Sequence, residues 1–192
     1  MSADPRRKDL DAAVLRWMRE AAANPVAAWR RNDDRFDTLA LQTFDYQFRN
    51  CEAYARYCEA IRLTNPREWR EIPAVPAGAF KEMRLASFDV SSTAKIFRTS
   101  GTSAGRRGEL HLDRLELYEA SLQASLEHLF FADCAAPSRL RMRVLAPSKT
   151  ESPESSLSHM FEYLLAARGD DQSGFDVLDG ALRSETVLTS LK

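Results

Sequence analysis

The placement of glycine constrains this chain more than any other feature of its sequence. The 192 residues contain only seven glycines, yet Gly101, Gly105 and Gly108 fall within eight consecutive positions. Glycine lets a backbone turn freely and approach a ligand closely, so this local enrichment predicts a segment with a special conformation. The β-branched and aromatic run at 94–99 is typical of a strand leading into the segment, and 110–112 is predicted to be the returning strand.

The residues before this segment are predicted to be helical. Apolar side chains recur every three or four positions over 10–21 and again over 36–61, where a break near Asn50 fits the pattern. Cys51 and Cys58 lie on the second apolar stripe, and a thiol there behaves as a small hydrophobic group. We therefore expect both cysteines to be buried for structural reasons.

The remaining sequence predicts an α/β fold in one domain. A helical region over 1–63 is followed by a proline-rich connection over 64–93, where three prolines exclude a continuous helix. Strands then alternate with helices over 94–192, which is typical of a partly parallel sheet. The expected later elements are a helix from Asp113, with Asp113 and Glu116 as its N-cap pair, strands at 140–146 and 175–178, and helices at 155–168, closed by Gly169, and from Ser184.

Charge and composition exclude several function classes. With 27 Lys plus Arg against 28 Asp plus Glu, the chain has no overall attraction for nucleic acid or an anionic membrane. Its three cysteines and three histidines show no zinc-ligand spacing, so no metal site is predicted. No apolar run resembles a signal peptide or a membrane span, and we expect a cytoplasmic protein.

The glycine-rich segment carries the chemistry, and its residues allow three interpretations. Hydroxyl groups, turning backbone N–H groups and two arginines within 98–108 would suit a polyphosphate, although the spacing is not that of a Walker loop. A plain polar hairpin turn would have a similar composition. Residues 101–105 also fit the G-x-S-x-G pattern of serine hydrolases, with Ser103 as nucleophile and His159 with Asp133 or Asp170 as partners, although no helix pattern follows directly.

Four stretches of the chain resemble one known family. They are FDYQFRNCEAYARYCEA at 44–60, WREIPAVPAGAFKEMRLASF at 69–88, FRTSGTSAGRRGELHLDRLELYEASL at 97–122 and VLAPSKTESPESSLSHMFEYLL at 144–165. Together they are similar, in register, to the acyl-protein synthetases of the bacterial luciferase system (LuxE type). These proteins are distant relatives of phenylacetate–coenzyme A ligases among the adenylate-forming enzymes.

The resemblance implies a two-step ligase reaction and the residues that would support it. A fatty or other carboxylic acid would be activated by ATP, with Mg²⁺ accompanying the nucleotide, and the acyl group would then pass to a protein thiol. Ala104 is an extra residue, and Arg106-Arg107 replaces the usual Pro-Lys, so the arginine that takes the lysine's role is undecided. The phosphate-binding residues carried over from the family are Thr99, Ser100, Gly101, Thr102, Ser103, Gly105, Arg106 and Arg107.

The same resemblance implies an incomplete adenylate-forming domain. The ribose-contacting acid and the acyl-accepting cysteine of the family are expected beyond Lys192, so no catalytic residue is carried over. The implied partners are the acid substrate and either a separate C-terminal half or an acyl-accepting or reductase protein. A catalytically silent nucleotide-binding or interaction module is the alternative, and a link to bioluminescence stays open.

Several charged side chains outside the segment are expected to lie on the surface without a role in binding or catalysis. Lys81 and Arg84, at helical spacing, could reach a phosphate, but a solvated face is the simpler expectation. His159 is expected to be a surface histidine. Arg139, Arg141 and Arg143 alternate along a predicted strand and are expected to form a solvated edge.

Overall fold

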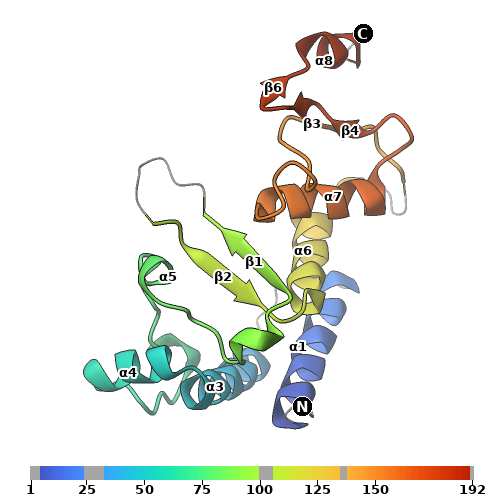
Figure 1. The fold of residues 1–192 in the computed structure, drawn as a ribbon. Helices are drawn as coiled ribbons and strands as arrows, with labels where there is room; N and C mark the ends of the chain where they lie inside the picture. The colour runs from blue at the N-terminus through green and yellow to red at the C-terminus, as the bar shows by residue number, and fades with distance from the viewer. Residues whose placement is uncertain (1–4, 24–32, 100–105, 135–137, 191–192) are drawn as a thin grey trace. The chain divides into compact units, whose positions relative to one another are not determined.

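A computed structural model describes residues 5–23, 33–99, 106–134 and 138–190 (Figure 1). It confirms the mixed α/β class. The chain divides into two compact units, Met1–Phe130 and Phe131–Lys192. We describe each unit by itself.

The first unit is built around helices. They are α1 (Pro5–Ala23), α3 (Asp33–Asn50), α4 (Glu52–Ala60) and α6 (Glu116–Leu129), and α1 packs against both α3 and α6 (Figure 1). The expected break near Asn50 is confirmed, because Cys51 between α3 and α4 is extended, with φ −121° and ψ 95°.

The core of this unit lies where α3 meets α4. Phe44, Cys51, Tyr54 and Cys58 are buried together, as the apolar spacing predicted. Cys58 has no exposed surface, and burial raises the pKa of its thiol. Both cysteines of the stripe are therefore structural, in agreement with the expectation from the sequence.

The proline-rich connection is ordered by hydrogen bonds to α4. It contains only single turns: η1 (Trp69–Glu71), α5 (Ala79–Glu82) and η2 (Val90–Ser92). The Tyr54 hydroxyl donates to the Pro73 carbonyl at 2.8 Å, and the Tyr57 hydroxyl donates to the Ala74 carbonyl at 3.1 Å. These bonds hold the connection against the helical core, and the exclusion of a continuous helix is confirmed.

The strands that flank the glycine-rich segment form an antiparallel hairpin. Strand β1 (Lys95–Arg98) pairs with β2 (Glu109–Leu112), with Arg98 opposite Glu109 and Phe97 opposite Leu110. Phe97 is buried, and its ring centroid lies 5.2 Å from that of Tyr118 on α6. The predicted pair of strands is confirmed, and packing on α6 fixes its position.

The predicted N-cap of α6 is wrong. The helix begins at Glu116 after Leu115, and no side chain caps it. Asp113 instead accepts a hydrogen bond from Arg7 Nη2 at 2.8 Å and lies 3.5 Å from Arg114 Nη2. Burial lowers the pKa of Arg7, but the bond to Asp113 and the nearby charges of Asp113 and Asp11 together raise the pKa overall. The Asp113 carboxylate is therefore bonded to Arg7 in a partly buried ion pair and does not cap α6.

The second unit contains one parallel pair of strands. Strand β3 (Arg143–Val144) pairs with β4 (Gly174–Phe175), and helix α7 (Ser156–Arg168) connects them. The Ser155 side chain accepts from the Ser158 backbone N–H and so caps α7. A hairpin of β5 (Val177–Leu178) and β6 (Ala181–Leu182) and helix α8 (Ser184–Ser190) follow.

The strand predictions in this unit are only partly right. Over 140–146 the regular strand is two residues long, with an isolated bridge between Leu140 and Gly169. The strand expected at 175–178 is split at Asp176 into two pairings. Within the described residues, the strands form three separate two-stranded sheets, of which one is parallel.

Two of the three alternating arginines are also not the solvated edge that we expected. Arg143 forms a two-pronged ion pair with Asp176, whose side chain is fully buried, and this bond raises the pKa of Arg143. Arg139 Nη1 donates to the Ala166 and Gly169 carbonyls, at 3.0 Å each. Arg139 therefore contacts backbone carbonyls at the end of α7, Arg143 contacts Asp176 directly after β4, and Arg141 is half-exposed.

Candidate functional site

The base of the glycine-rich segment is closed by three hydrogen bonds. Thr99 N donates to the Gly108 carbonyl at 3.0 Å, and Gly108 N donates to Thr99 Oγ1 at 2.9 Å. Arg107 Nε donates to the Thr99 carbonyl at 2.8 Å. A β-carbon on Gly108 would lie 3.3 Å from Thr99 Cγ2 and 3.5 Å from Phe80 Cβ, so the absence of a side chain permits this close approach.

The structure describes three of the eight predicted phosphate-binding residues. Thr99, Arg106 and Arg107 are exposed at the end of the β1–β2 hairpin. The other five lie outside the described residues: Ser100, Gly101, Thr102, Ser103 and Gly105. Because the Thr99 hydroxyl uses its oxygen as an acceptor for Gly108, its proton can still be donated to another group.

A cationic cavity of about 600 Å³ adjoins these residues. Five basic side chains line it together with two carboxylates, which gives the cavity an excess of positive charge. Such a wall attracts anions more strongly than the nearly neutral chain as a whole does. We call it the cationic cavity; its lining consists of Phe80, Lys81, Glu82, Met83, Arg84, Arg98, Arg106, Arg107, Glu109 and His111.

Lys81 and Arg84 both line this cavity, and the expected solvated face holds for Lys81 but not for Arg84, which is half-buried. Lys81 is exposed but lies in the cavity wall. Arg84 lies 4.9 Å from the centre of the Phe88 ring and donates from Nη2 to the Phe88 carbonyl at 2.7 Å. Its Nε is buried and has no hydrogen-bond partner in the described part of the chain. The packing of α5 against β2 brings both cations to the hairpin.

Sequence reasoning missed the group of Arg98, Glu109 and His111. Arg98 Nε lies 2.9 Å from Glu109 Oε1, and His111 Nε2 lies 3.2 Å from Glu109 Oε2. The hydrogen bond from Arg98 lowers the pKa of Glu109. The signal was present, because alternate residues of one strand share a face and Arg98 is opposite Glu109.

His111 contributes a polar atom that no described residue satisfies. Its side chain is only 9% exposed, and its Nδ1 is buried without a hydrogen-bond partner among the described residues. Buried polar atoms are normally paired, and both this nitrogen and Arg84 Nε belong to residues that line the cationic cavity. The ring nitrogen can act as a donor or as an acceptor, according to the tautomer.

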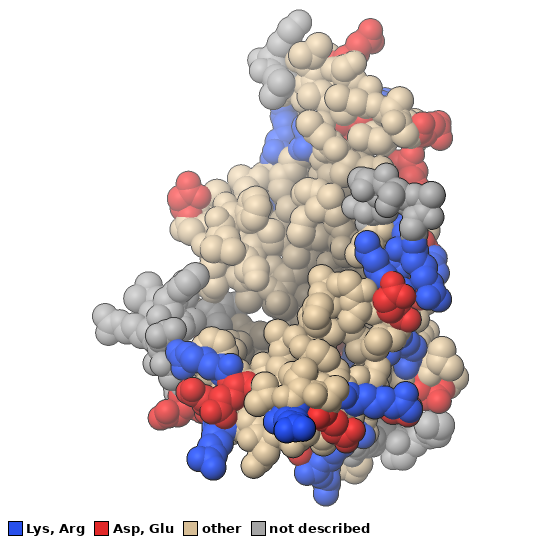
Figure 2. Space-filling model, turned by 90° about the vertical axis from the view of Figure 1, so that its left-hand side faces the viewer, with Lys and Arg blue, Asp and Glu red and all other residues tan. Residues whose placement is uncertain are grey.

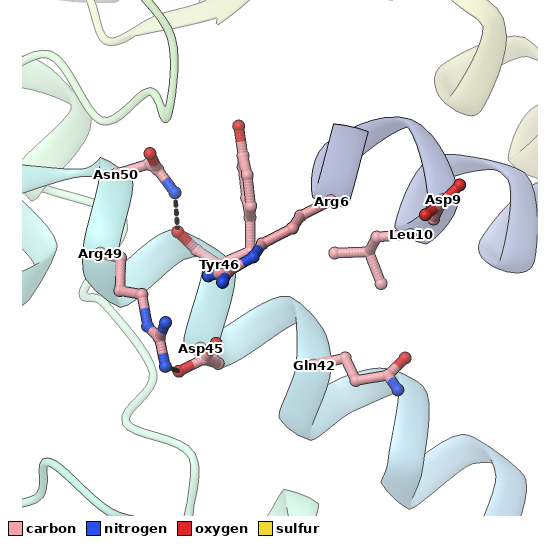
Figure 3. Close-up of a pocket in the computed structure, with 8 residues that line it drawn as sticks. All are labelled: Arg6, Asp9, Leu10, Gln42, Asp45, Tyr46, Arg49 and Asn50. Carbon is pink, nitrogen blue, oxygen red and sulfur yellow. Dashed lines mark hydrogen bonds and ion pairs between the residues drawn. The ribbon is translucent and has the colours of Figure 1, made fainter. Parts of the chain in front are cut away.

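A second polar cavity, of about 440 Å³, lies between α1 and α3 (Figure 3). Arg6 and Arg49 line it, but so do Asp9 and Asp45, and Arg49 is paired with Asp45 at 2.7 Å. Figure 2 shows basic and acidic side chains lying beside each other on the face that it presents. This cavity contains no predicted phosphate-binding residue, and its mixed charge is less suited to a polyanion.

The hydrolase interpretation finds no support in the described residues. A nucleophile elbow requires a helix directly after its serine. Here β2 begins at Glu109, and the next helix begins only at Glu116. His159 is buried in α7 rather than on the surface, which corrects our expectation, and Asp170 is bonded to Ser173 and Gln172.

The described ranges contain no cluster of three or more His, Cys, Asp or Glu that could hold a metal ion. None of their helices has both the length and the apolar character needed to cross a membrane.

Comparison with known proteins gives one informative match. No family model and no solved structure matches the chain. A long-chain-fatty-acid–luciferin-component ligase from Photorhabdus luminescens is 30% identical over 91 residues, which cover 47% of this chain and 78% of the relative. The chain therefore belongs to the long-chain-fatty-acid–luciferin-component ligase family.

Proposed function

We propose that the chain takes part in the ATP-dependent activation of a fatty acid, and that the cationic cavity receives the triphosphate. The observation that carries the proposal is the gathering of five basic side chains beside the closed base of the glycine-rich segment. The name of the relative, a fatty-acid ligase, supports the choice of substrate class. The resemblance to adenylate-forming enzymes supports ATP as the co-substrate.

The proposed reaction has two balanced steps. A carboxylate oxygen attacks the α-phosphorus of ATP, and the bond from that phosphorus to the bridging oxygen breaks, which releases pyrophosphate and leaves an acyl-adenylate. A thiol sulfur then attacks the acyl carbon, AMP leaves, and the thiol proton passes to solvent or a base. Mg²⁺ would enter with the nucleotide and neutralise part of the phosphate charge.

The residues of the segment have defined roles in the first step. Backbone N–H groups and the hydroxyl groups of Thr99, Ser100, Thr102 and Ser103 would donate hydrogen bonds to phosphate oxygens, while Gly101 and Gly105 would let the backbone come close. Arg106 and Arg107 would stabilise the charge that develops on the leaving pyrophosphate. His111 and Arg84, which line the same cavity, would supply additional polar contacts.

Substitutions of Ser103 and Gly101 test whether the glycine-rich segment binds the triphosphate. As one phosphate donor among several, Ser103→Ala should weaken MgATP binding by about 1 to 3 kcal/mol. Gly101→Val should weaken it more, because a β-branched side chain resists the turn and keeps the phosphate from the backbone. A fluorophosphonate probe should not label the native chain.

The alternatives give different results in the same experiment. Stoichiometric labelling at Ser103 would replace the ligase assignment with a serine hydrolase. Absence of both labelling and MgATP binding would leave the silent interaction module. Equal loss of MgATP binding in Ser103→Ala and Gly101→Val would contradict a phosphate site shared among many donors.

A further inference from the structure

Two carboxylates line the cationic cavity among its basic side chains, and they differ in what they contact. Glu109 is bonded through both oxygens: Oε1 lies 2.9 Å from Arg98 Nε, and Oε2 lies 3.2 Å from His111 Nε2. Glu82 is exposed, and its side chain has no ion pair or hydrogen bond within the described ranges. Of these two carboxylates, Glu109 is therefore the one paired with a basic side chain of the cavity wall.

The pairing of Glu109 is a consequence of the β1–β2 register. Arg98 and Glu109 lie opposite each other in the antiparallel pair, and directly opposite side chains lie on the same face of the two strands. His111 is two residues further along β2, so its side chain lies on that face as well. The hydrogen bond from Arg98 lowers the pKa of Glu109, so this carboxylate is charged at neutral pH. The chain thus supplies an anion to its own cationic cavity.

The contact between Arg98 and Glu109 is accessible enough to be exchanged for a ligand. The two side chains are 32% and 38% exposed, respectively. An ion pair with this exposure is weak, because water and salt screen it. A polyphosphate in the cavity would meet the other basic side chains as well as Arg98, and a guanidinium can donate two parallel hydrogen bonds to a phosphate. Such a ligand can displace the carboxylate at little cost.

We propose that Glu109 is an internal counter-anion of the cationic cavity: it is bonded to Arg98 when no ligand is present, gives up that bond to a polyphosphate, and so limits the affinity of the cavity. The inference deepens the proposed function, on which it rests for the identity of the anion as a triphosphate. Glu109 keeps its contact with His111 during the exchange, because that contact uses the other oxygen. The return of the carboxylate to Arg98 then favours the release of pyrophosphate.

A counter-anion and a purely structural ion pair predict opposite effects on binding. If Glu109 only held the hairpin in shape, its loss would weaken the binding of a polyphosphate. A competing carboxylate acts in the other direction, through competition for Arg98 and through repulsion of the phosphate charges. Glu82 is the matched control, because it lines the same cavity but pairs with no cation in the described part of the chain. Its removal reports repulsion without competition.

Titration calorimetry of the intact chain with inorganic tripolyphosphate measures both effects. At about 0.1 M salt, Glu109→Gln should bind tripolyphosphate about threefold to tenfold more tightly than the native chain, and Glu82→Gln at most about twofold more tightly. At about 1 M salt the gain in Glu82→Gln should disappear, whereas part of the gain in Glu109→Gln should remain, because salt screens distant charges more than a direct contact.

A double substitution isolates the competition for Arg98. In an Arg98→Gln chain there is no guanidinium to compete for, so the addition of Glu109→Gln should tighten tripolyphosphate binding no more than Glu82→Gln does in the native background. Weaker binding in Glu109→Gln, an equal gain in Glu109→Gln and Glu82→Gln, or an undiminished gain in the Arg98→Gln background would overturn the proposal. Circular dichroism identifies a variant that fails to fold, and Glu109→Ala then replaces Glu109→Gln.

The outcomes separate this inference from the proposed function. If Glu109→Gln binds tripolyphosphate more tightly as described but MgATP does not bind to either chain, the proposed function fails and the counter-anion stands. If MgATP binds to the native chain but Glu109→Gln leaves the affinity for tripolyphosphate unchanged, the counter-anion is refuted and the proposed function stands. Absence of binding of both ligands to every chain refutes both.

Discussion

The hydroxyl oxygen of Thr99 accepts a hydrogen bond from the Gly108 backbone N–H at 2.9 Å, and this bond joins the two ends of the glycine-rich segment. Thr99 N also donates to the Gly108 carbonyl, so the two residues are linked in both directions. The closure fixes where the segment leaves β1 and where it returns to β2. It thereby places Arg106 and Arg107 in the wall of the cationic cavity.

Replacing Thr99 by valine tests this closure. Thr99→Val keeps the shape but removes the acceptor, so the free energy of unfolding should fall by about 0.5 to 1.5 kcal/mol and the Gly108 amide should exchange faster. Thr93→Val is the control, because Thr93 Oγ1 is buried without a hydrogen-bond partner in the described ranges. That change should be neutral or slightly stabilising. Equal effects of the two variants in urea unfolding would contradict the role of Thr99.

Two glycine variants test the close approach at the base of the segment. Gly108→Ala places a methyl group 3.3 Å from Thr99 Cγ2, so it should destabilise the chain by about 1 kcal/mol and weaken MgATP binding. Gly78→Ala is the matched control, since nothing lies within 4 Å of its β-carbon and its φ of −61° suits alanine. It should be neutral or stabilising by about 0.4 to 1 kcal/mol. Thermal unfolding of both variants measures the difference.

The ion pair of Arg98 and Glu109 predicts a pH dependence of stability. The pKa of Glu109 is lowered in the folded state by the hydrogen bond from Arg98, so its contribution is present above the ordinary glutamate value and is lost as the pH falls through the folded value. Glu109→Gln should therefore show a smaller loss of unfolding free energy below about pH 4.5 than the native chain. Glu59→Gln, exposed on α4, controls for removal of a charge. Identical pH profiles of Glu109→Gln and the native chain would refute the coupling.

The end of α7 requires glycine for a steric reason. Gly169 has an ordinary φ of −71°, but a β-carbon there would lie 2.5 Å from the Leu165 carbonyl oxygen. Gly169→Ala should therefore lower the unfolding free energy by about 2 kcal/mol. Gly174→Ala should change it by less than about 0.5 kcal/mol, because its nearest neighbour is Arg143 Nη1 at 3.8 Å. Urea unfolding that ranks the two variants in the opposite order would contradict the packing.

Local patterns in the sequence predicted the hairpin and most helices because their causes are local. The strand at 94–99, the helical periodicity over 36–61 and the helix at 155–168 all depend on residues a few positions apart. The position of Gly169 as the end of α7 was predicted correctly, but the reason is close packing rather than a left-handed conformation.

The errors came from contacts between residues far apart in the chain. Asp113 was predicted to cap α6, but its partner is Arg7, 106 residues away. Arg143 was assigned to a solvated edge, but the parallel pairing of β3 with β4 brings it to Asp176. The cationic cavity was missed because α5 must first pack on β2, and the sequence contains no local signal for that contact.

Amide hydrogen exchange in the presence of nucleotide tests the central claim most directly. MgATP should slow exchange at Thr99, Arg106, Arg107 and Gly108, whereas MgAMP, which lacks the β- and γ-phosphates, should slow it less. The amides of α1 and α3 that flank the cavity of Figure 3 should not change. Unchanged exchange at these four amides with saturating MgATP, or protection confined to α1 and α3, would contradict a triphosphate site in the cationic cavity.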